Sequence, residues 1–287
     1  MDMWFLPVKK QAADIQSAML PCTMCRGQKR APEGNDGGIK YWWILPFLSF
    51  FFSLNNQSFW IDECCTALCA MQQGMEGCWK KICEIGGSDA QMAFYYYLLF
   101  LWHHLTGAES EWMLRLFNIF WVFLSSWFFR KEPKALVILL ISPFFVYYSN
   151  ELRPYMLQIA ASCAVSMLFW QVSRGEPVKF HVFFGSLFFL CLTSLTGVVW
   201  ALGFAAAFMV MAFRQFGGRR FRRALLWWIF PFSGLGAYYL YTLFLGARAV
   251  SISSSWIVNA CASMYELSGL AGMGPSRLEL RMCMTPD

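Results

Sequence analysis

Long apolar runs recur from Tyr41 to Gly246, and Lys and Arg collect in the short polar segments between them. A helix that crosses a bilayer needs about 20 mostly apolar residues, whereas one soluble core does not need so many such runs. Of the 287 residues, 58% are hydrophobic and 14% are charged, against roughly a quarter charged in ordinary soluble domains. The pattern predicts an all-α, polytopic transmembrane helical bundle. It does not indicate nucleic acid binding, because the net charge of +6 comes from loops.

Apolar length divides the chain into about seven predicted spans. They are Tyr41–Leu54, Trp112–Phe129, Ala135–Tyr148, Leu152–Val172, two crossings within His181–Phe213, and Ala224–Gly246. The run of 33 residues at 181–213 is too long for one crossing, so a break is expected near Thr193–Gly197.

The remaining segments are assigned by polarity. Residues 1–40 are mixed in charge, lack an evident cleavable signal peptide, and are expected to form a poorly ordered cytoplasmic segment. Residues 41–246 form the membrane module, with a first outer loop at 55–111. In that loop we expect helices along the membrane interface, one beginning at Thr66–Met71 and one at Met92–Leu105. Residues 247–287 are expected to be an extracytoplasmic, truncated tail.

The distribution of basic residues orients the bundle. With a cytoplasmic N-terminus and seven spans, 16 of the 23 Lys and Arg fall on the cytoplasmic side, while 11 of the 17 acids fall outside. Cytoplasmic loops carry the excess of Lys and Arg in membrane proteins. Treating Met92–Leu105 as a crossing would place the five-arginine run at 214–223 outside, which this rule disfavours.

This orientation gathers the unusual charges on one face. Asp62 and Glu63 follow the first span, Arg115 lies near the outer end of the second, and Glu151 and Arg153 join the third and fourth. We expect Ser149 or Asn150 to cap the fourth span, with Pro154 in its first turn. A helix N-terminus beside an arginine suits phosphate, and a carboxylate facing a hydroxyl can act as a general base. Together these features suggest group transfer from a phospholipid-like donor.

Several short segments follow one another in a recognisable order. They are Trp60-Ile61-Asp62-Glu63, Asp89 leading into Phe94-Tyr95-Tyr96, Leu114-Arg115-Leu116, and Ser142-Pro143 through Ser149-Asn150-Glu151-Leu152-Arg153-Pro154-Tyr155. In order and spacing they resemble the GT-C membrane glycosyltransferases, in the branch of protein O-mannosyltransferases, lipid A aminoarabinose transferases and RgtA/B/C/D-like proteins. The resemblance covers roughly residues 41–280.

The resemblance implies an inverting transfer from a polyprenyl-phosphate sugar to a glycan, lipid or protein acceptor at the extracytoplasmic face of a bacterial inner membrane. It implies that Asp62 is the base, with Glu63 its neighbour in the acidic pair. It also implies that Glu151 and Arg153 shape the site or hold the donor phosphate. Tyr155, Arg115 and Asp89 are further candidates for substrate binding. No Asp-x-Asp signature is present, so no metal is required and a divalent ion is left open.

The chain also departs from the family pattern. Gln91-Met92-Ala93 stands where relatives carry two prolines, and Ser194-Leu195-Thr196-Gly197 stands where many carry a histidine. Relatives also have more spans. The rival hypothesis is therefore a non-enzymatic membrane protein, either a degenerate or partner module or a transporter, although a transporter would place its charges near the midplane of the bilayer.

Each candidate residue also has a structural interpretation. Asp62 and Glu63 can be solvated acids at the start of an interfacial helix near Cys64, and Glu151 with Arg153 can be an ion pair that anchors a helix. Arg115 can extend outward to the interface.

The histidines and cysteines give weaker signals. His103 and His104 lack a nearby acid or cysteine at ligand spacing, so placement at the interface is favoured over metal binding. Cys22 and Cys25 form a lone CxxC without a second pair. The cysteines of the first outer loop are interpreted as small buried helix residues, with disulfide pairing as the alternative.

Overall fold

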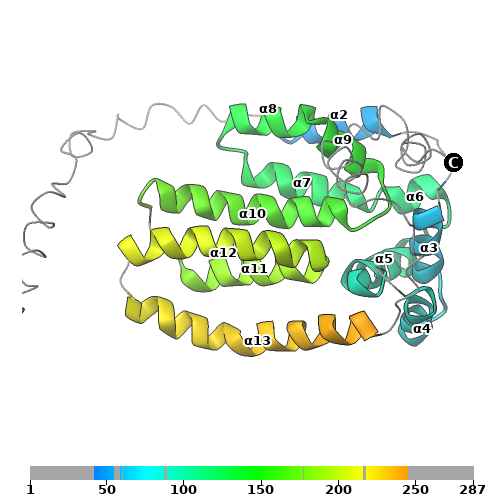
Figure 1. Cartoon of the computed structure of the whole chain (residues 1–287). Coiled ribbons are helices and arrows are strands. Elements are labelled where there is room, and N and C mark those ends of the chain that lie inside the picture. The colour runs from blue at the N-terminus through cyan, green and yellow to red at the C-terminus, as the bar shows by residue number, and fades with distance from the viewer. Residues whose placement is uncertain are drawn as a thin grey trace, which may run out of the picture. The chain divides into compact units, whose positions relative to one another are not determined.

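The computed structural model describes residues 42–54, 59, 61–86, 89–176, 178–215 and 218–244. These residues form helices and their connections, and no strand occurs among them (Figure 1). The all-α class is therefore confirmed. The tails predicted at 1–40 and 247–287, with Cys22 and Cys25, lie outside the described residues.

The helices follow the predicted runs in order. The first part of the chain contains α2 (Ile44–Ser53), α3 (Ile61–Ala70), α4 (Met75–Ile85), the 3-10 turn η2 (Ala90–Met92), α5 (Ala93–Thr106), α6 (Glu111–Arg115) and α7 (Asn118–Phe128). The second part contains α8 (Pro133–Ile141), α9 (Pro143–Asn150), α10 (Tyr155–Ser173), α11 (Phe180–Thr193), α12 (Leu195–Gln215) and α13 (Gly218–Phe244).

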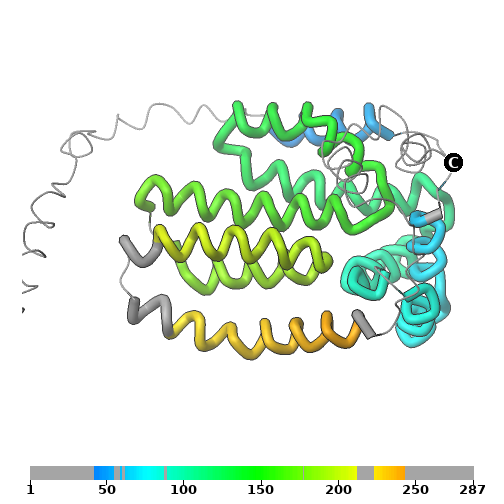
Figure 2. The backbone as a smooth tube through the Cα atoms, in the orientation of Figure 1, coloured from blue at the N-terminus to red at the C-terminus, as the bar shows by residue number. Residues whose placement is uncertain are grey.

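Helices α10 to α13 pack side by side, and α7 packs against α10 (Figure 2). Their short connections make consecutive helices antiparallel. A buried cluster fills the space between them, centred on Phe183, Leu187, Leu190 and Phe208. The rings of Phe183 and Phe208 stack with centroids 3.6 Å apart. This packing fixes the position of the N-terminal end of α10, next to which the candidate residues lie.

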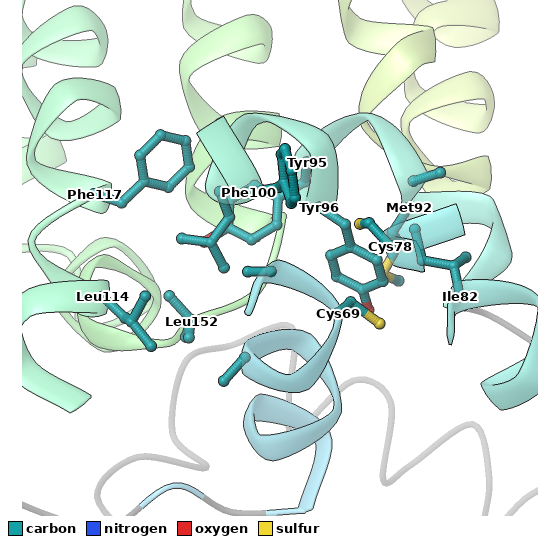
Figure 3. Packing of buried hydrophobic residues seen from close by; sticks show 14 of the residues in the cluster. Cys69, Cys78, Ile82, Met92, Tyr95, Tyr96, Phe100, Leu114, Phe117 and Leu152 are labelled. Carbon is teal, nitrogen blue, oxygen red and sulfur yellow. The ribbon is translucent and has the colours of Figure 1, made fainter. Parts of the chain in front are cut away.

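The helices of the first outer loop have a core of their own. Helix α3 packs against α4 and α5, and α5 also touches α11. Figure 3 shows the buried side chains that they share, among them Cys69, Cys78, Ile82, Tyr95 and Tyr96. Helix α5 ends at Gly107, whose φ of 66° is a left-handed conformation that glycine adopts without strain. Its bounds match the helix predicted at 92–105 within one residue.

The break predicted near Thr193–Gly197 is confirmed. Ser194 is extended between α11 and α12, with φ −177° and ψ 170°. Its hydroxyl accepts a hydrogen bond from the Gly197 amide at 3.1 Å, so the serine caps the first turn of α12. Gly197 is required at this point because an added Cβ would lie 2.3 Å from the Leu190 carbonyl oxygen.

Two of the predicted spans are not continuous helices. The run at 135–148 divides at Ser142, whose ψ of 125° follows from the clash that a proline imposes on the residue before it, here Pro143. The run at 112–129 divides between α6 and α7. The structure gives no single cause for this second break.

One helix of the described residues is both long and apolar enough to cross a membrane, namely α10 with 19 residues. The apolar helices Ile44–Ser53, Phe180–Thr193 and Leu195–Met211 are shorter.

Candidate functional site

The candidate residues are carried by α3, η2, α6 and the connection from α9 to α10. Asp62 and Glu63 lie in the first turn of α3, which begins at Ile61 rather than near Cys64 or Thr66 as predicted. Asp89 immediately precedes η2, and Arg115 is the last residue of α6. The other three segments meet the connection from α9 to α10 at residues 151–153. Two buried ion pairs described below, each with an arginine, make these contacts.

The connection between α9 and α10 differs from the predicted capping. Ser149 and Asn150 are the last residues of α9, and Pro154 occupies the N-cap position of α10 without a side-chain capping bond. The prediction that Ser149 or Asn150 caps this helix was therefore wrong. Asn150 instead donates to the Ser53 hydroxyl of α2. Tyr155 begins α10, and its ring lies 4.7 Å from that of Tyr148.

Glu63 and Arg115 form a buried ion pair. The Nη2 and Nε atoms of Arg115 lie 2.9 Å and 3.3 Å from the two carboxylate oxygens of Glu63, and each side chain is 4% exposed. The amide of Leu152 also donates to Glu63 at 2.7 Å. The guanidinium of Arg115 lies 4.9 Å from the ring centroid of Phe59. Glu63 is thus occupied in joining α3, α6 and the connection before α10.

Arg153 forms a second buried pair. Its Nη1 atom lies 2.8 Å from Asp89 Oδ1 and donates to the Tyr96 hydroxyl at 3.1 Å. Weaker contacts reach the Thr66 hydroxyl at 3.4 Å and the Asp62 carbonyl at 3.5 Å. The Tyr96 hydroxyl also donates to Asp89. Burial raises the pKa of Tyr96 well above its ordinary value, so this hydroxyl keeps its proton.

Two polar atoms beside this cluster have no hydrogen-bond partner among the described residues. They are Nε of Arg153 and Oδ1 of Asn150, and both atoms are buried. Most buried polar atoms in folded proteins are hydrogen bonded. These atoms therefore have donor and acceptor capacity that the described part of the fold does not use.

Asp62 differs from the other acids of the site. Its side chain is half-buried, and its carboxylate makes no hydrogen bond or ion pair with a described residue. Its carbonyl accepts from the Thr66 hydroxyl at 2.9 Å, which holds the first turn of α3. The backbone carbonyl of Asp62 lies 3.5 Å from Nη1 of Arg153. The positive charge of Arg153 attracts the Asp62 carboxylate. A charged acid is favoured at a helix N-terminus.

Glu151 is buried, and its backbone joins neighbouring segments. Its carbonyl accepts from the Asn118 side chain at 2.7 Å, and from the Arg153 amide at 2.8 Å. The Tyr95 hydroxyl donates to the other end of the Asn118 amide at 3.1 Å. Through Arg153, the structure brings together Asp89 and the backbone carbonyl of Asp62, and it places Glu63 and Arg115 in a neighbouring pair.

Sequence reasoning missed Tyr96, Thr66, Asn118 and Tyr95 as members of these networks. Tyr96 lies seven residues after Asp89, and Thr66 lies four after Asp62, at helical spacing. That spacing is the only local signal that links them. The contacts of Asn118, Tyr96 and Thr66 with Glu151 or Arg153 bridge 33 to 87 residues of sequence, and Tyr95 contacts Asn118 across 23 residues.

A cavity of about 450 Å³ opens beside this region between α4, α5, α11 and α13. It is lined by Trp79, Ala93, Phe94, Tyr97, Leu192, Leu235 and Tyr238. The hydroxyl of Tyr238 donates to the carbonyl of Ala90, the residue after Asp89. The cavity is therefore apolar and lies next to η2. Neither Asp62 nor Arg153 lines it.

The part of the chain that the structure describes contains no group of three or more His, Cys, Asp or Glu side chains placed to hold a metal ion. His103 and His104 each bond a backbone carbonyl, those of Ala108 and Phe100. The seven described cysteines are free. No family model, curated protein or solved structure matches the chain.

Proposed function

We propose that this chain is a multi-pass membrane protein of about seven spans. The surface of its helices supports the proposal, because large apolar side chains point outward from α2, α12 and α13. Phe52 is 87% exposed, Phe230 85% and Trp227 73%. Soluble proteins rarely expose apolar patches of this kind, whereas lipid covers them. The two short pairs α6–α7 and α8–α9 then cross as interrupted helices, which is tolerated where neighbouring protein satisfies the freed backbone groups.

The two ends of the bundle differ in charge. The connections 129–134 and 174–179 carry five basic and two acidic residues, and an ion pair of Arg174 with Glu132 at 2.9 Å joins them. The opposite end carries Asp62, Glu63 and Asp89. This asymmetry supports a cytoplasmic basic end and an extracytoplasmic site. Placement in a bacterial inner membrane is proposed from the family resemblance alone.

Within this frame, the function we propose is transfer of a sugar from a polyprenyl-phosphate donor to an acceptor hydroxyl. The observation that carries it is the half-buried Asp62 carboxylate, which has no described partner and belongs to the residue whose backbone carbonyl lies 3.5 Å from Nη1 of the buried Arg153. An acid without a partner is available to take a proton, and a buried cation nearby can offset negative charge on a leaving phosphate.

The reaction is a single displacement. Asp62 takes the proton of the acceptor hydroxyl while the hydroxyl oxygen forms a bond to the anomeric carbon. The bond from that carbon to the phosphate oxygen breaks, and its electron pair leaves with the lipid phosphate. The positive charge of Arg153 offsets the negative charge that develops on that phosphate. The configuration at the anomeric carbon inverts because attack and departure occur on opposite faces.

The neighbouring groups position these two residues. Asp89 and Tyr96 hold the guanidinium of Arg153, while Glu63 and Arg115 hold α3 against α6. The apolar cavity beside η2 suits the first isoprene units of the donor, since it is lined mainly by aromatic and aliphatic side chains. Glu151 and Tyr155 flank Arg153 in the connection that leads into α10.

The test is sugar transfer by the purified chain with polyprenyl-phosphate sugar, comparing Asp62→Asn with the wild type. Loss of a general base lowers turnover by about 100- to 10,000-fold. Glu109→Gln is the matched control, because Glu109 is exposed in the same loop and bonds no described residue. Turnover that is unchanged in Asp62→Asn would remove Asp62 from the catalytic role.

One observation favours the non-enzymatic alternative. Nη1 of Arg153 is used within the fold by Asp89 and Tyr96, which is what an ion pair that only anchors a helix would show. If the chain is a partner module, the wild type transfers no sugar, and Arg153→Ala lowers the midpoint of thermal unfolding. Measurable wild-type turnover that falls in Asp62→Asn excludes this alternative.

A further inference from the structure

At the end of the bundle opposite Asp62, two connections form one surface. The first joins α7 to α8, and the second joins α10 to α11. Nη2 of Arg174 lies 2.9 Å from Oε1 of Glu132, which holds the two connections together. We call this the basic-aromatic surface, and it consists of Trp127, Arg130, Lys131, Lys134, Trp170, Arg174 and Lys179.

The surface is strongly basic. It contains five cationic side chains, and the only acids in the described parts of the two connections are Glu132 and Glu176. Lys131, Lys134 and Lys179 are exposed and make no ion pair or hydrogen bond with a described residue. The three lysines are therefore available to an anionic partner without breaking a contact of the described fold.

Two tryptophans border the charges. The guanidinium of Arg130 lies 3.7 Å from the ring centroid of Trp127, and that of Arg174 lies 4.9 Å from that of Trp170. The two indoles are 47% and 48% exposed. Tryptophan has an apolar ring system and a polar N–H, and it is enriched where lipid headgroups meet acyl chains. The cation–π contacts hold the arginines at this boundary.

The helices that follow the two connections, α8 and α11, indicate that a ligand of this surface has an apolar part. Lys134, Ile138 and Ile141 are spaced by four and three residues, so they share one face of α8. Ile138 and Ile141 are 67% and 70% exposed. On α11, Val182 is 49% exposed three residues after Lys179. Lys134 and Lys179 thus each lie beside exposed apolar side chains, which fits a ligand with an anionic head and a hydrocarbon tail.

We propose that the basic-aromatic surface binds the headgroups of anionic phospholipids. The phosphodiester lies among Lys131, Lys134 and Lys179, whose ammonium groups balance its negative charge. The acyl chains lie along α8 and α11. A free phosphate fits less well, because it leaves the apolar strips uncovered. The inference rests on the proposed membrane placement, but not on sugar transfer.

The experiment uses the full chain purified in detergent, with dioleoyl phosphatidylglycerol or dioleoyl phosphatidylcholine added, and counts retained lipids by native mass spectrometry. The test variant combines Lys131→Gln, Lys134→Gln and Lys179→Gln. The control combines Lys80→Gln and Lys81→Gln on α4, at the other end of the bundle. Inorganic phosphate is added in a separate arm as a competitor.

We expect the wild type to retain phosphatidylglycerol in preference to phosphatidylcholine. Each lysine removed should weaken phosphatidylglycerol binding by about fivefold, while the control variant keeps wild-type binding. Inorganic phosphate should not displace the lipid. The proposal is overturned if the triple variant retains phosphatidylglycerol like the wild type, if both lipids bind equally, or if inorganic phosphate displaces the lipid.

Failure of the membrane placement gives a different result. A chain that remains in solution without detergent and does not associate with mixed phosphatidylglycerol and phosphatidylcholine vesicles overturns both proposals. A chain that inserts into the vesicles but shows no headgroup preference overturns the headgroup proposal alone.

Discussion

Nη2 of Arg115 lies 2.9 Å from Oε2 of Glu63, with both side chains 4% exposed and 52 residues apart in sequence. The pair joins α3 of the outer loop to α6, and Glu63 also accepts the amide of Leu152. A buried ion pair adds little stability over an apolar pair of the same shape, but removal of one partner leaves an uncompensated charge.

The first prediction concerns this pair. Glu63→Gln keeps the volume and one acceptor oxygen but leaves the buried Arg115 cation without its counter-charge. We expect the free energy of unfolding to fall by about 3–5 kcal/mol. Denaturant titration in detergent, followed by tryptophan fluorescence, measures the change.

The matched control is Glu84→Gln, which breaks the Lys81–Glu84 pair on the surface of α4. These side chains are 35% and 51% exposed, so the change should stay within about 0.5 kcal/mol. Equal effects of the two substitutions would contradict the structural role assigned to Glu63.

The second prediction concerns Tyr96, whose hydroxyl bonds both Asp89 and Arg153. Tyr96→Phe removes the hydroxyl and leaves two buried charged groups with fewer partners. We expect a loss of about 1–3 kcal/mol in the free energy of unfolding. Tyr97→Phe is the control, because its hydroxyl makes no hydrogen bond with a described residue. A Tyr97→Phe effect as large as that of Tyr96→Phe would show that the loss comes from packing.

The third prediction concerns the break between α11 and α12. In Gly197→Ala, the new methyl group lies 2.3 Å from the Leu190 carbonyl oxygen and 2.6 Å from the Thr193 hydroxyl. Since the nearest atom belongs to the backbone, relief requires the two helices to shift, and overpacking of this kind costs about 1–3 kcal/mol. The midpoint of thermal unfolding in detergent should fall.

Gly203→Ala provides the comparison on the same helix. No atom lies within 4 Å of the added methyl group, and alanine favours helix over glycine by up to about 1 kcal/mol. The midpoint should therefore hold or rise. A fall as large as that of Gly197→Ala would contradict the close approach of α11 and α12.

The fourth prediction concerns thiol reactivity in the outer loop. Burial raises the pKa of the Cys69 thiol to about 12 and that of the Cys78 thiol to about 11, from an ordinary value of 9.0. Cys64 is exposed. At a pH below 9.0, iodoacetamide should label Cys64 and spare Cys69 and Cys78 in the folded chain, because thiolate is the reactive form.

Peptide mass spectrometry before and after unfolding measures this labelling, and all three cysteines should react once the chain is unfolded. The same pKa shifts have a consequence for stability. Because the folded state holds these protons more tightly, their stabilising contribution is complete below pH 9.0 and is lost as the pH rises toward 11–12. Rapid labelling of Cys78 in the folded chain would contradict its burial.

Local sequence patterns predicted much of the fold. The break at Ser194 follows from the excess length of an apolar run, and the bounds of α5 follow from its composition. The break at Ser142 was missed although Pro143 signals it, because apolar length was given more weight than the restriction before proline. The extra turn at the start of α3 was also missed, although Asp62 and Glu63 are acids of the kind that is favoured in a first helical turn.

The candidate site was predicted less completely. Asp62, Asp89 and Arg153 were named from the sequence, and the structure brings them together. The sequence did not predict which acid pairs with which arginine. The choice between Asp89 and Glu63 as the partner of Arg153 depends on how α3, η2 and α6 pack. Glu63 and Asp62 are adjacent in the sequence, yet successive residues of a helix point about 100° apart. One is therefore buried while the other remains half-exposed.

The hydrogen bond from Tyr238 to the carbonyl of Ala90 joins the last described helix to the turn beside Asp89 across 148 residues. During synthesis, residues 61–153 leave the ribosome well before residue 238. The arrangement around Asp89 and Arg153 is therefore completed late, after most of the polypeptide has been made, and a nascent chain that stops before α13 lacks this contact.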